Sequence, residues 1–264
     1  MDFTAYQCLR FSRQGRVLTV ALNRPEQRNA VNAQLHTELS RVWADLQRDQ
    51  DSDIIVLTGE GAAFCAGGDI AWMQSQVDDP AAFDRMAREA KDIALGQLDL
   101  DKPLIAKVNG HAIGLGASLA LLSDIVLISA DAKIGDPHVS VGLVAGDGGA
   151  LIWPQIVGFA KARKYLFTGE LLSAAEAERI GLVTEVHPRD QLDAAADALA
   201  QRLAGGATLA MRYTKITVNL PLRALFHAHF DAGLAYECLS NRSADHAEAV
   251  AAFRERRKPH FSGR

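Results

Sequence analysis

Two glycine-rich stretches of the sequence have the composition of a site that binds a negatively charged oxygen. One covers residues 59–70 (GEGAAFCAGGDI) and the other residues 109–116 (NGHAIGLG), and each follows an apolar run and precedes a predicted helix. Glycine lets the backbone approach a ligand closely, and the first N–H groups of a helix have no partner within it. A single junction of this kind is equally explained by a phosphate site or a tight turn. Two of them, aimed at one oxygen, would form an oxyanion hole.

The elements that must position these stretches are alternating strands and helices. Short apolar runs predict strands at residues 6–11, 16–22, 53–58, 104–108, 125–129 and 182–187. Apolar spacing and capping signals predict helices at residues 32–48, 80–98, 117–122 and 173–180. Strands that alternate with helices indicate an α/β core.

After about residue 189 the pattern becomes helical throughout. Helices are predicted at residues 191–203, 207–220, 222–239 and 244–256. Gly205, Gly206 and Pro221 are predicted to separate them. Phe226 and Phe230 belong to an apolar surface on the third of these helices, and this surface needs a partner, which is either the chain's own core or another subunit.

This change of pattern predicts two regions, a core over residues 1–200 and a helical oligomerisation region over residues 201–264. The chain has 264 residues, of which 48% are hydrophobic and 23% charged, and its net charge is −4. A mildly acidic chain has no overall attraction for nucleic acid or an anionic membrane. Three widely spaced cysteines do not suggest disulfides. With no secretory signal pattern and no apolar run long enough to cross a bilayer, we expect a cytoplasmic protein.

Five stretches, in order along the chain, resemble the crotonase (enoyl-CoA hydratase/isomerase) superfamily. They are residues 22–32 (LNRPEQRNAVN), 64–70 (FCAGGDI), 109–123 (NGHAIGLGASLALLS), 142–149 (GLVAGDGG) and 253–261 (FRERRKPHF). The resemblance implies an α/β fold, a spiral of β-β-α units with a C-terminal helical trimerisation region, and a homotrimer or homohexamer. It does not specify the reaction, because one fold hosts many activities.

The resemblance also implies an acyl-coenzyme A thioester as the substrate. The N–H groups of Gly68 and Leu115 would hold the thioester carbonyl oxygen and stabilise an enolate. The residues implied along the coenzyme A path are Arg28, Ala66, Asp69, Ile70, Ala71 and Lys258. Lys258 would act within its own subunit or from a neighbouring one, and each basic side chain has the plain alternative of a solvated surface charge. Coenzyme A arrives as part of the substrate, so neither a separate cofactor nor a metal is predicted.

Two positions depart from the pattern of the family's hydratases. Those enzymes use two glutamates to position and activate water, and the matching positions here hold Ser118 and His138. Without either carboxylate, simple addition of water is not the expected reaction. His138 and Asp147 are the candidates for proton transfer, since histidine titrates near neutral pH and burial raises the pKa of an aspartate. Ser118 would hydrogen-bond His138 or the substrate.

Each of these three residues also has a plainer interpretation. Asp147 is a favoured cap for a helix that begins near Gly148, His138 could be a turn residue bonded to backbone, and Ser118 could merely pack within its helix. The functional prediction is an acyl-CoA enzyme that stabilises a thioester enolate, an isomerase or lyase without the two-glutamate machinery. The alternatives are hydration, hydrolysis or decarboxylation of a CoA ester, C–C cleavage, and a non-catalytic acyl-CoA-binding paralogue. An RNA-binding role for the basic C-terminal residues is opposed by the acidic net charge.

Overall fold

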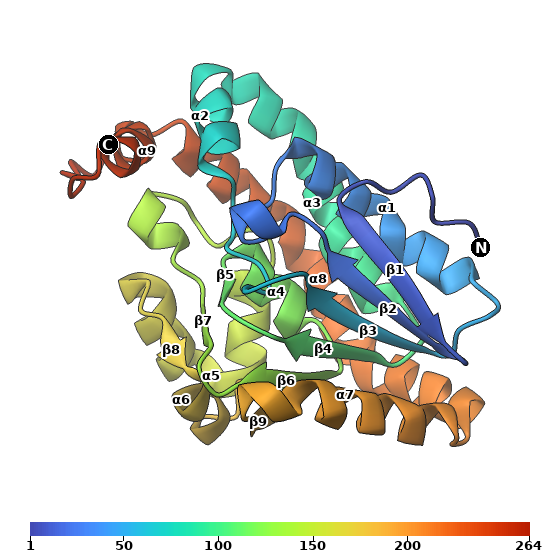
Figure 1. Cartoon of the computed structure of the whole chain (residues 1–264). Helices are drawn as coiled ribbons and strands as arrows, with labels where there is room; N and C mark the ends of the chain where they lie inside the picture. The colour runs from blue at the N-terminus through green and yellow to red at the C-terminus, as the bar shows by residue number, and fades with distance from the viewer.

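Two β-sheets form the frame of the protein (Figure 1). The structure, a computed structural model, describes residues 1–264, with the side chain of Arg85 set aside. The six-stranded sheet has the order β1 (Leu9–Gln14), β2 (Val17–Leu22), β3 (Ile54–Gly59), β4 (Leu104–Val108), β6 (Ile125–Ser129), β9 (Glu185–His187). The three-stranded sheet has the order β5 (Ala112–Ile113), β7 (Lys133–Gly135), β8 (Leu172–Ser173). In the larger sheet β1 and β2 are antiparallel and the other neighbours are parallel.

Both faces of the larger sheet are covered by helices. Ile54, Ile105 and Leu127 pack on one face against α7 (Arg189–Ala204), which runs along the sheet in Figure 1. Ile55 and Leu57 belong to the main core on the other face, where α1 (Ala33–Arg48) and α3 (Pro80–Asp99) lie. This arrangement explains the almost continuous apolar strand sequences, because successive side chains of a parallel strand enter two different buried layers.

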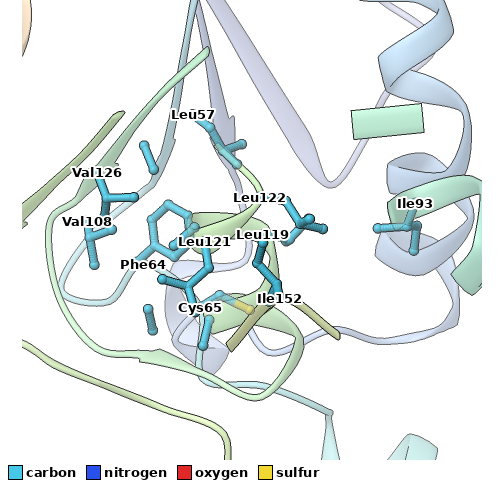
Figure 2. Packing of buried hydrophobic residues seen from close by; sticks show 14 of the residues in the cluster. Leu57, Phe64, Cys65, Ile93, Val108, Leu119, Leu121, Leu122, Val126 and Ile152 are labelled. Atoms are coloured by element: carbon cyan, nitrogen blue, oxygen red, sulfur yellow. The ribbon is translucent and has the colours of Figure 1, made fainter. Parts of the chain in front are cut away.

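The main core surrounds α4 (Leu115–Leu121) and holds the two glycine stretches together. Figure 2 shows Phe64 and Cys65, which follow β3, among core residues that include Leu119 and Leu121 of α4. An isolated bridge joins Cys65 to Ala112 in β5. A Cβ atom added to Gly116 would lie 2.6 Å from the Cβ of Cys65. The sequence therefore needs glycine at this point so that α4 can pack directly on the first glycine stretch.

Most predicted elements are confirmed, with shifts at their ends. β4 and β6 have the predicted bounds, whereas β1 starts at Leu9, β9 covers only the last three residues of 182–187, and α4 begins at Leu115. The expected cap of α6 (Ala174–Arg179) is present, since the N–H of Glu176 donates to the Ser173 hydroxyl at 3.2 Å. The short strands β5, β7 and β8 and most of α5 (Gly149–Thr168) were not predicted.

The predicted break at Pro221 is wrong. One helix, α8, runs from Thr208 to Asn241 through this proline. Proline removes one backbone donor at a local cost, but α8 packs along α3 and α5, and this tertiary packing outweighs the cost. Phe226 and Phe230 are buried in the chain's own core. The division into residues 1–200 and 201–264 stays a prediction.

The C-terminal helix α9 (Ala244–Arg254) lies against α2 (Ile70–Asp78), the helix that follows the first glycine stretch (Figure 1). No helix among the described residues has the length and apolar character needed to cross a bilayer.

Candidate active site

A cavity of about 520 Å³ lies where the two glycine stretches meet α2, α3 and the segment that precedes α5. Four of the five residues predicted to act in catalysis line it: Gly68, Leu115, His138 and Asp147. The fifth, Ser118, is buried beside Asp147. The structure therefore brings the predicted oxyanion donors and the predicted proton carriers to one place.

Gly68 and Leu115 each present a backbone N–H without a partner in the described part of the chain. The bridge between Val31 and Gly68 uses the N–H of Val31, which donates to Gly67 at 2.8 Å, and the N–H of Asp69, which donates to Val31 at 2.9 Å. Neither of these two hydrogen bonds uses the N–H of Gly68. Leu115 opens α4, so its N–H has no acceptor within the helix. Both residues line the cavity, which is the arrangement that an oxyanion hole requires.

The backbone around these donors depends on glycine. Gly67 has a φ of +88° and Gly114 a φ of +56°, in the left-handed region that side chains disfavour. A Cβ atom on Gly114 would lie 3.6 Å from Cε1 of His138. The second glycine stretch thus passes close to the imidazole ring, which places His138 beside the Leu115 donor.

Four side chains form a hydrogen-bonded and ionic chain next to the donors. Nδ1 of His138 lies 2.5 Å from Oδ1 of Asp136, and Nε2 of His138 lies 3.7 Å from Oδ2 of Asp147. The Ser118 hydroxyl donates to Oδ1 of Asp147 at 3.3 Å. Of the two partners predicted for Ser118, His138 and the substrate, the structure replaces His138 with Asp147. Gly148 is the N-cap residue of α5, and the backbone N–H of Gly149, at the start of the helix, also interacts with the Asp147 carboxylate.

Burial and the charges of neighbouring side chains set the pKa values of His138 and Asp147. Burial opposes the charge on His138, but the carboxylates of Asp136 and Asp147 outweigh it and raise the pKa of His138 well above its usual value. Burial also raises the pKa of Asp147, and His138 offsets part of that rise. A cationic imidazole beside an aspartate of raised pKa is an arrangement that can take up and return a proton near neutral pH.

Glu237, on α8, is a site residue that the sequence reasoning missed. It is 4% exposed, it lines the cavity, and its Oε2 has no hydrogen-bond partner among the described residues. Burial, with the charge of Asp147, raises the pKa of Glu237 to about 8. A signal was present in the sequence, because Glu237 continues the buried stripe of Phe226, Phe230 and Leu234 along one helix face. A carboxylate on such a stripe is rare unless it has a function or a partner.

The residues implied for the coenzyme A path fall into two groups. Arg28, Ala66, Asp69, Ile70 and Ala71 all line the cavity. The side chain of Asp69 is also the cap of α2, where it accepts the N–H of Ala71 at 3.0 Å, and it pairs with Arg24 at 3.2 Å. Lys258 does not line this cavity in its own chain.

Comparison with known proteins decides the family. The family model described as enoyl-CoA hydratase/isomerase matches residues 12–264. The chain belongs to the enoyl-CoA hydratase/isomerase family. Among its relatives, a probable enoyl-CoA hydratase of Mycobacterium bovis is 36% identical over 264 residues, which cover 98% of this chain and 99% of the relative. The 1,2-epoxyphenylacetyl-CoA isomerase of Escherichia coli is 34% identical, with 94% of this chain and 95% of the relative covered.

Solved structures confirm the crotonase fold. The crystal structure of an enoyl-CoA hydratase/isomerase from Mycobacterium paratuberculosis has a TM-score of 0.89 at 37% identity and covers 92% of this chain and 97% of its own. A β-diketone hydrolase from Anabaena sp. PCC 7120, bound to (S)-3-oxocyclohexyl acetic acid, has a TM-score of 0.83 at 32% identity and covers 91% and 96%. The chain is thus an enzyme of the hydratase/isomerase type, and the family contains more than one reaction.

Within this family frame, Asp136, His138 and Asp147 also form a group whose potential metal-ligand atoms lie within 4.8 Å of one another. The two carboxylates take opposite nitrogens of the ring, however, and Nδ1 is already bonded to Asp136. An ion at Nε2 would share only His138 and Asp147, which is fewer protein ligands than zinc sites use. The geometry fits a proton-carrying chain better than a metal centre.

Proposed function

We propose that this family member forms the enolate of an acyl-CoA thioester and moves a proton through Asp147 and His138, without the two glutamates of a hydratase. One observation carries the proposal: the free N–H groups of Gly68 and Leu115 and the Asp147–His138 pair line one cavity. Such a site can withdraw electrons from a carbonyl and remove a proton from the neighbouring carbon. Double-bond isomerisation is the reaction that needs these two functions alone.

In the proposed reaction the thioester oxygen accepts hydrogen bonds from the two N–H groups. The Asp147 carboxylate removes a proton from the carbon next to the carbonyl, and the electron pair of that C–H bond moves to the oxygen. The imidazolium of His138 stabilises the ionised Asp147 before this step. Glu237 is protonated below about pH 8, so it is a second proton source at the same cavity. Return of a proton to a different carbon completes an isomerisation.

The exchange of acyl-CoA protons for deuterium tests enolate formation without knowledge of the natural acyl group. Purified protein is incubated with butyryl-CoA in D₂O, and the mass of the thioester is followed. We expect uptake of deuterium at the carbon next to the carbonyl by the wild type and its loss in Asp147→Asn. Asp190→Asn, at an exposed position in the first turn of α7, is the matched control and should behave as wild type. Binding of butyryl-CoA without any exchange would contradict the proposal and favour a non-catalytic paralogue.

A second candidate is hydrolytic cleavage of a C–C bond between two carbonyl groups. It is favoured by the likeness to the solved β-diketone hydrolase together with a buried His–Asp pair that can activate water. Water would add to one carbonyl, the bond to the carbon between the carbonyls would break, and that carbon would leave as an enolate held by the N–H pair. The products are a carboxylic acid and a ketone. Consumption of a cyclic 1,3-diketone by the wild type, with no deuterium uptake into butyryl-CoA, would select this candidate.

We also propose that the chain self-associates through the outer face of α8. A groove of about 990 Å³ is lined by apolar residues of α8, α5 and the segment around β6. Val218 lines this groove and is largely exposed, and an exposed apolar surface of this kind marks a site of association. Light scattering after gel filtration should show a multiple of the 28.5 kDa chain mass, and Val218→Glu should reduce it. A monomeric wild type would contradict this proposal.

A further inference from the structure

Two buried polar side chains line the cavity from helices that carry none of the acid–base residues. His36 lies on α1 and is 2% exposed, and Gln76 lies on α2 and is 3% exposed. Their neighbours in the cavity wall are apolar, among them Met73 and Phe83. Polar groups buried in such surroundings cost stability unless they are hydrogen-bonded. Any hydrogen-bonding atom of His36 or Gln76 that has no protein partner therefore indicates a polar group on the ligand of this cavity.

His36 is held in one orientation by α3. Its Nδ1 lies 2.8 Å from Oε2 of Glu89, and Oε1 of Glu89 accepts the hydroxyl hydrogen of Thr37 at 2.9 Å. The hydrogen bond from His36 holds the pKa of Glu89 below its ordinary value, so Glu89 is an acceptor only. Because Glu89 occupies Nδ1, the ring nitrogen left for a ligand is Nε2. No described residue bonds to this nitrogen.

Gln76 has spare hydrogen-bonding capacity close to His36. One N–H of its amide donates to the sulfur of Met86 at 2.9 Å, and sulfur is a weak acceptor. The second amide hydrogen and Oε1 have no partner among the described residues. Trp72 connects the two groups, because its ring centroid lies 5.3 Å from that of His36 and it precedes Gln76 by one turn of α2. His36 and Gln76 therefore flank one aromatic wall.

We propose that His36 and Gln76 form a polar subsite for a hydroxyl group on the acyl chain of the substrate. The hydroxyl hydrogen-bonds to Nε2 of His36, the free amide atoms of Gln76 add polar capacity to the same cavity wall, and Trp72 packs on the carbon chain. A carboxylate fits this subsite poorly, because the carboxylate of Glu89, whose pKa is lowered, already lies 2.8 Å from the same imidazole. This assignment deepens the proposed function and rests on it, since it places the acyl chain of a CoA ester in this cavity.

Dissociation constants of saturated CoA esters test the subsite without requiring turnover. Hexanoyl-CoA is compared with 4-, 5- and 6-hydroxyhexanoyl-CoA by isothermal titration calorimetry. A hydrogen bond contributes up to about a factor of ten in such comparisons, so we expect one positional isomer to bind up to roughly tenfold more tightly than hexanoyl-CoA. His36→Leu should abolish this preference, so that the hydroxy ester and hexanoyl-CoA bind the variant with equal dissociation constants, and the ratio of the two constants is the readout because general damage to the pocket affects both esters alike.

Two further variants guard against a structural artefact. Gln76→Leu should also weaken the preference for the hydroxy ester, because it removes the second polar group of the subsite. His36→Gln keeps a hydrogen-bonding atom near the position of Nε2 and should retain part of it. His229→Leu, at an exposed position on α8, is the control and should keep the full preference.

Each outcome has one meaning. If hexanoyl-CoA binds but no hydroxy ester binds more tightly, the subsite is wrong and the proposed function stands. The subsite is also wrong if the preference survives in both His36→Leu and Gln76→Leu. If no CoA ester binds at all, the proposed function and the subsite both fail.

Discussion

Nε2 of His138 lies 3.7 Å from Oδ2 of Asp147, across a turn that α9 holds in place. Gly142, in the left-handed region, closes the short helix that begins at His138, and a Cβ atom there would lie 2.8 Å from the backbone nitrogen of His246. Nδ1 of His246 donates to the Val141 carbonyl at 2.7 Å. The pair proposed to move the proton is therefore positioned by the C-terminal helix, far away in sequence.

Removal of either member of this pair should stop proton transfer but leave ligand binding intact. General acid–base groups contribute typically about 10²–10⁴-fold to a rate, so Asp147→Asn and His138→Ala should each lower the deuterium-exchange rate by a factor in this range. The dissociation constant of butyryl-CoA should change little, because the two N–H donors belong to the backbone. Calorimetry beside the exchange assay separates the two effects. Weakened binding that fully accounts for the lost exchange would contradict the assigned role.

Loss of one backbone donor should have a comparable effect through a different cause. Gly68→Pro removes the N–H that faces the cavity, and loss of one oxyanion donor costs about 10²–10³ in kcat. Gly68→Ala keeps the N–H, and its Cβ would meet only the flexible Met73 side chain at 3.2 Å. The exchange rate of the alanine variant should therefore stay near that of wild type. Equal loss in both variants would show that the space around Gly68, not its N–H, is what matters.

The buried Glu237 should make stability depend on pH in a defined window. Its pKa is about 8 in the folded chain against an ordinary value of 4.5, so the folded state binds this proton more tightly than the unfolded state. The stability contributed by protonated Glu237 is fully present below about pH 4.5 and is lost as the pH rises to about 8. Glu237→Gln removes this dependence. Urea unfolding from pH 5 to pH 9 should show the wild type losing stability relative to the variant up to about pH 8, and a constant difference would contradict the assignment.

The contact between Gly116 and Cys65 should tolerate no side chain. A Cβ atom at Gly116 would lie 2.7 Å from the Cys65 carbonyl oxygen, which cannot move without displacing the bridge to Ala112. Overpacking of this kind typically costs about 1–3 kcal/mol, so Gly116→Ala should lower the urea midpoint accordingly. Gly205→Ala is the control, because the nearest atom to its Cβ would lie 3.5 Å away. A midpoint for Gly116→Ala equal to that of the control would contradict this packing.

Local sequence signals predicted the parts of the fold that depend on nearest neighbours. Apolar runs located β4 and β6, and the Ser173 cap located α6, because these features are set within a few residues. The same local rule placed a break at Pro221, where long-range packing of α8 determines the structure. The strands β5, β7 and β8 are two or three residues long and have no periodicity to detect.

The candidate site was predictable where a titratable residue falls within one of the recognised sequence stretches or at a position matched to the family. His138 and Asp147 were expected as proton carriers, and the structure brings them together at the N–H donors. Asp136 and Glu237 were not expected, because their importance follows from burial beside those two residues. The partner of Ser118 also depended on the three-dimensional packing of α4 against the segment before α5.

The bridge between Cys65 and Ala112 fixes the backbone that carries the two proposed carbonyl-binding donors, and the proposed acid–base side chains lie outside that backbone. The donors at Gly68 and Leu115 belong to backbone that is locked by this bridge and by the Gly116 contact. The side chains of His138, Asp147 and Glu237 come from the short helix His138–Val141, the loop before α5, and α8. Under the proposed mechanism, substitutions in those segments would change the acid–base groups and leave the two N–H donors in place. A single ancestral scaffold can in this way be reprogrammed by a few side chains, at little risk to its fold.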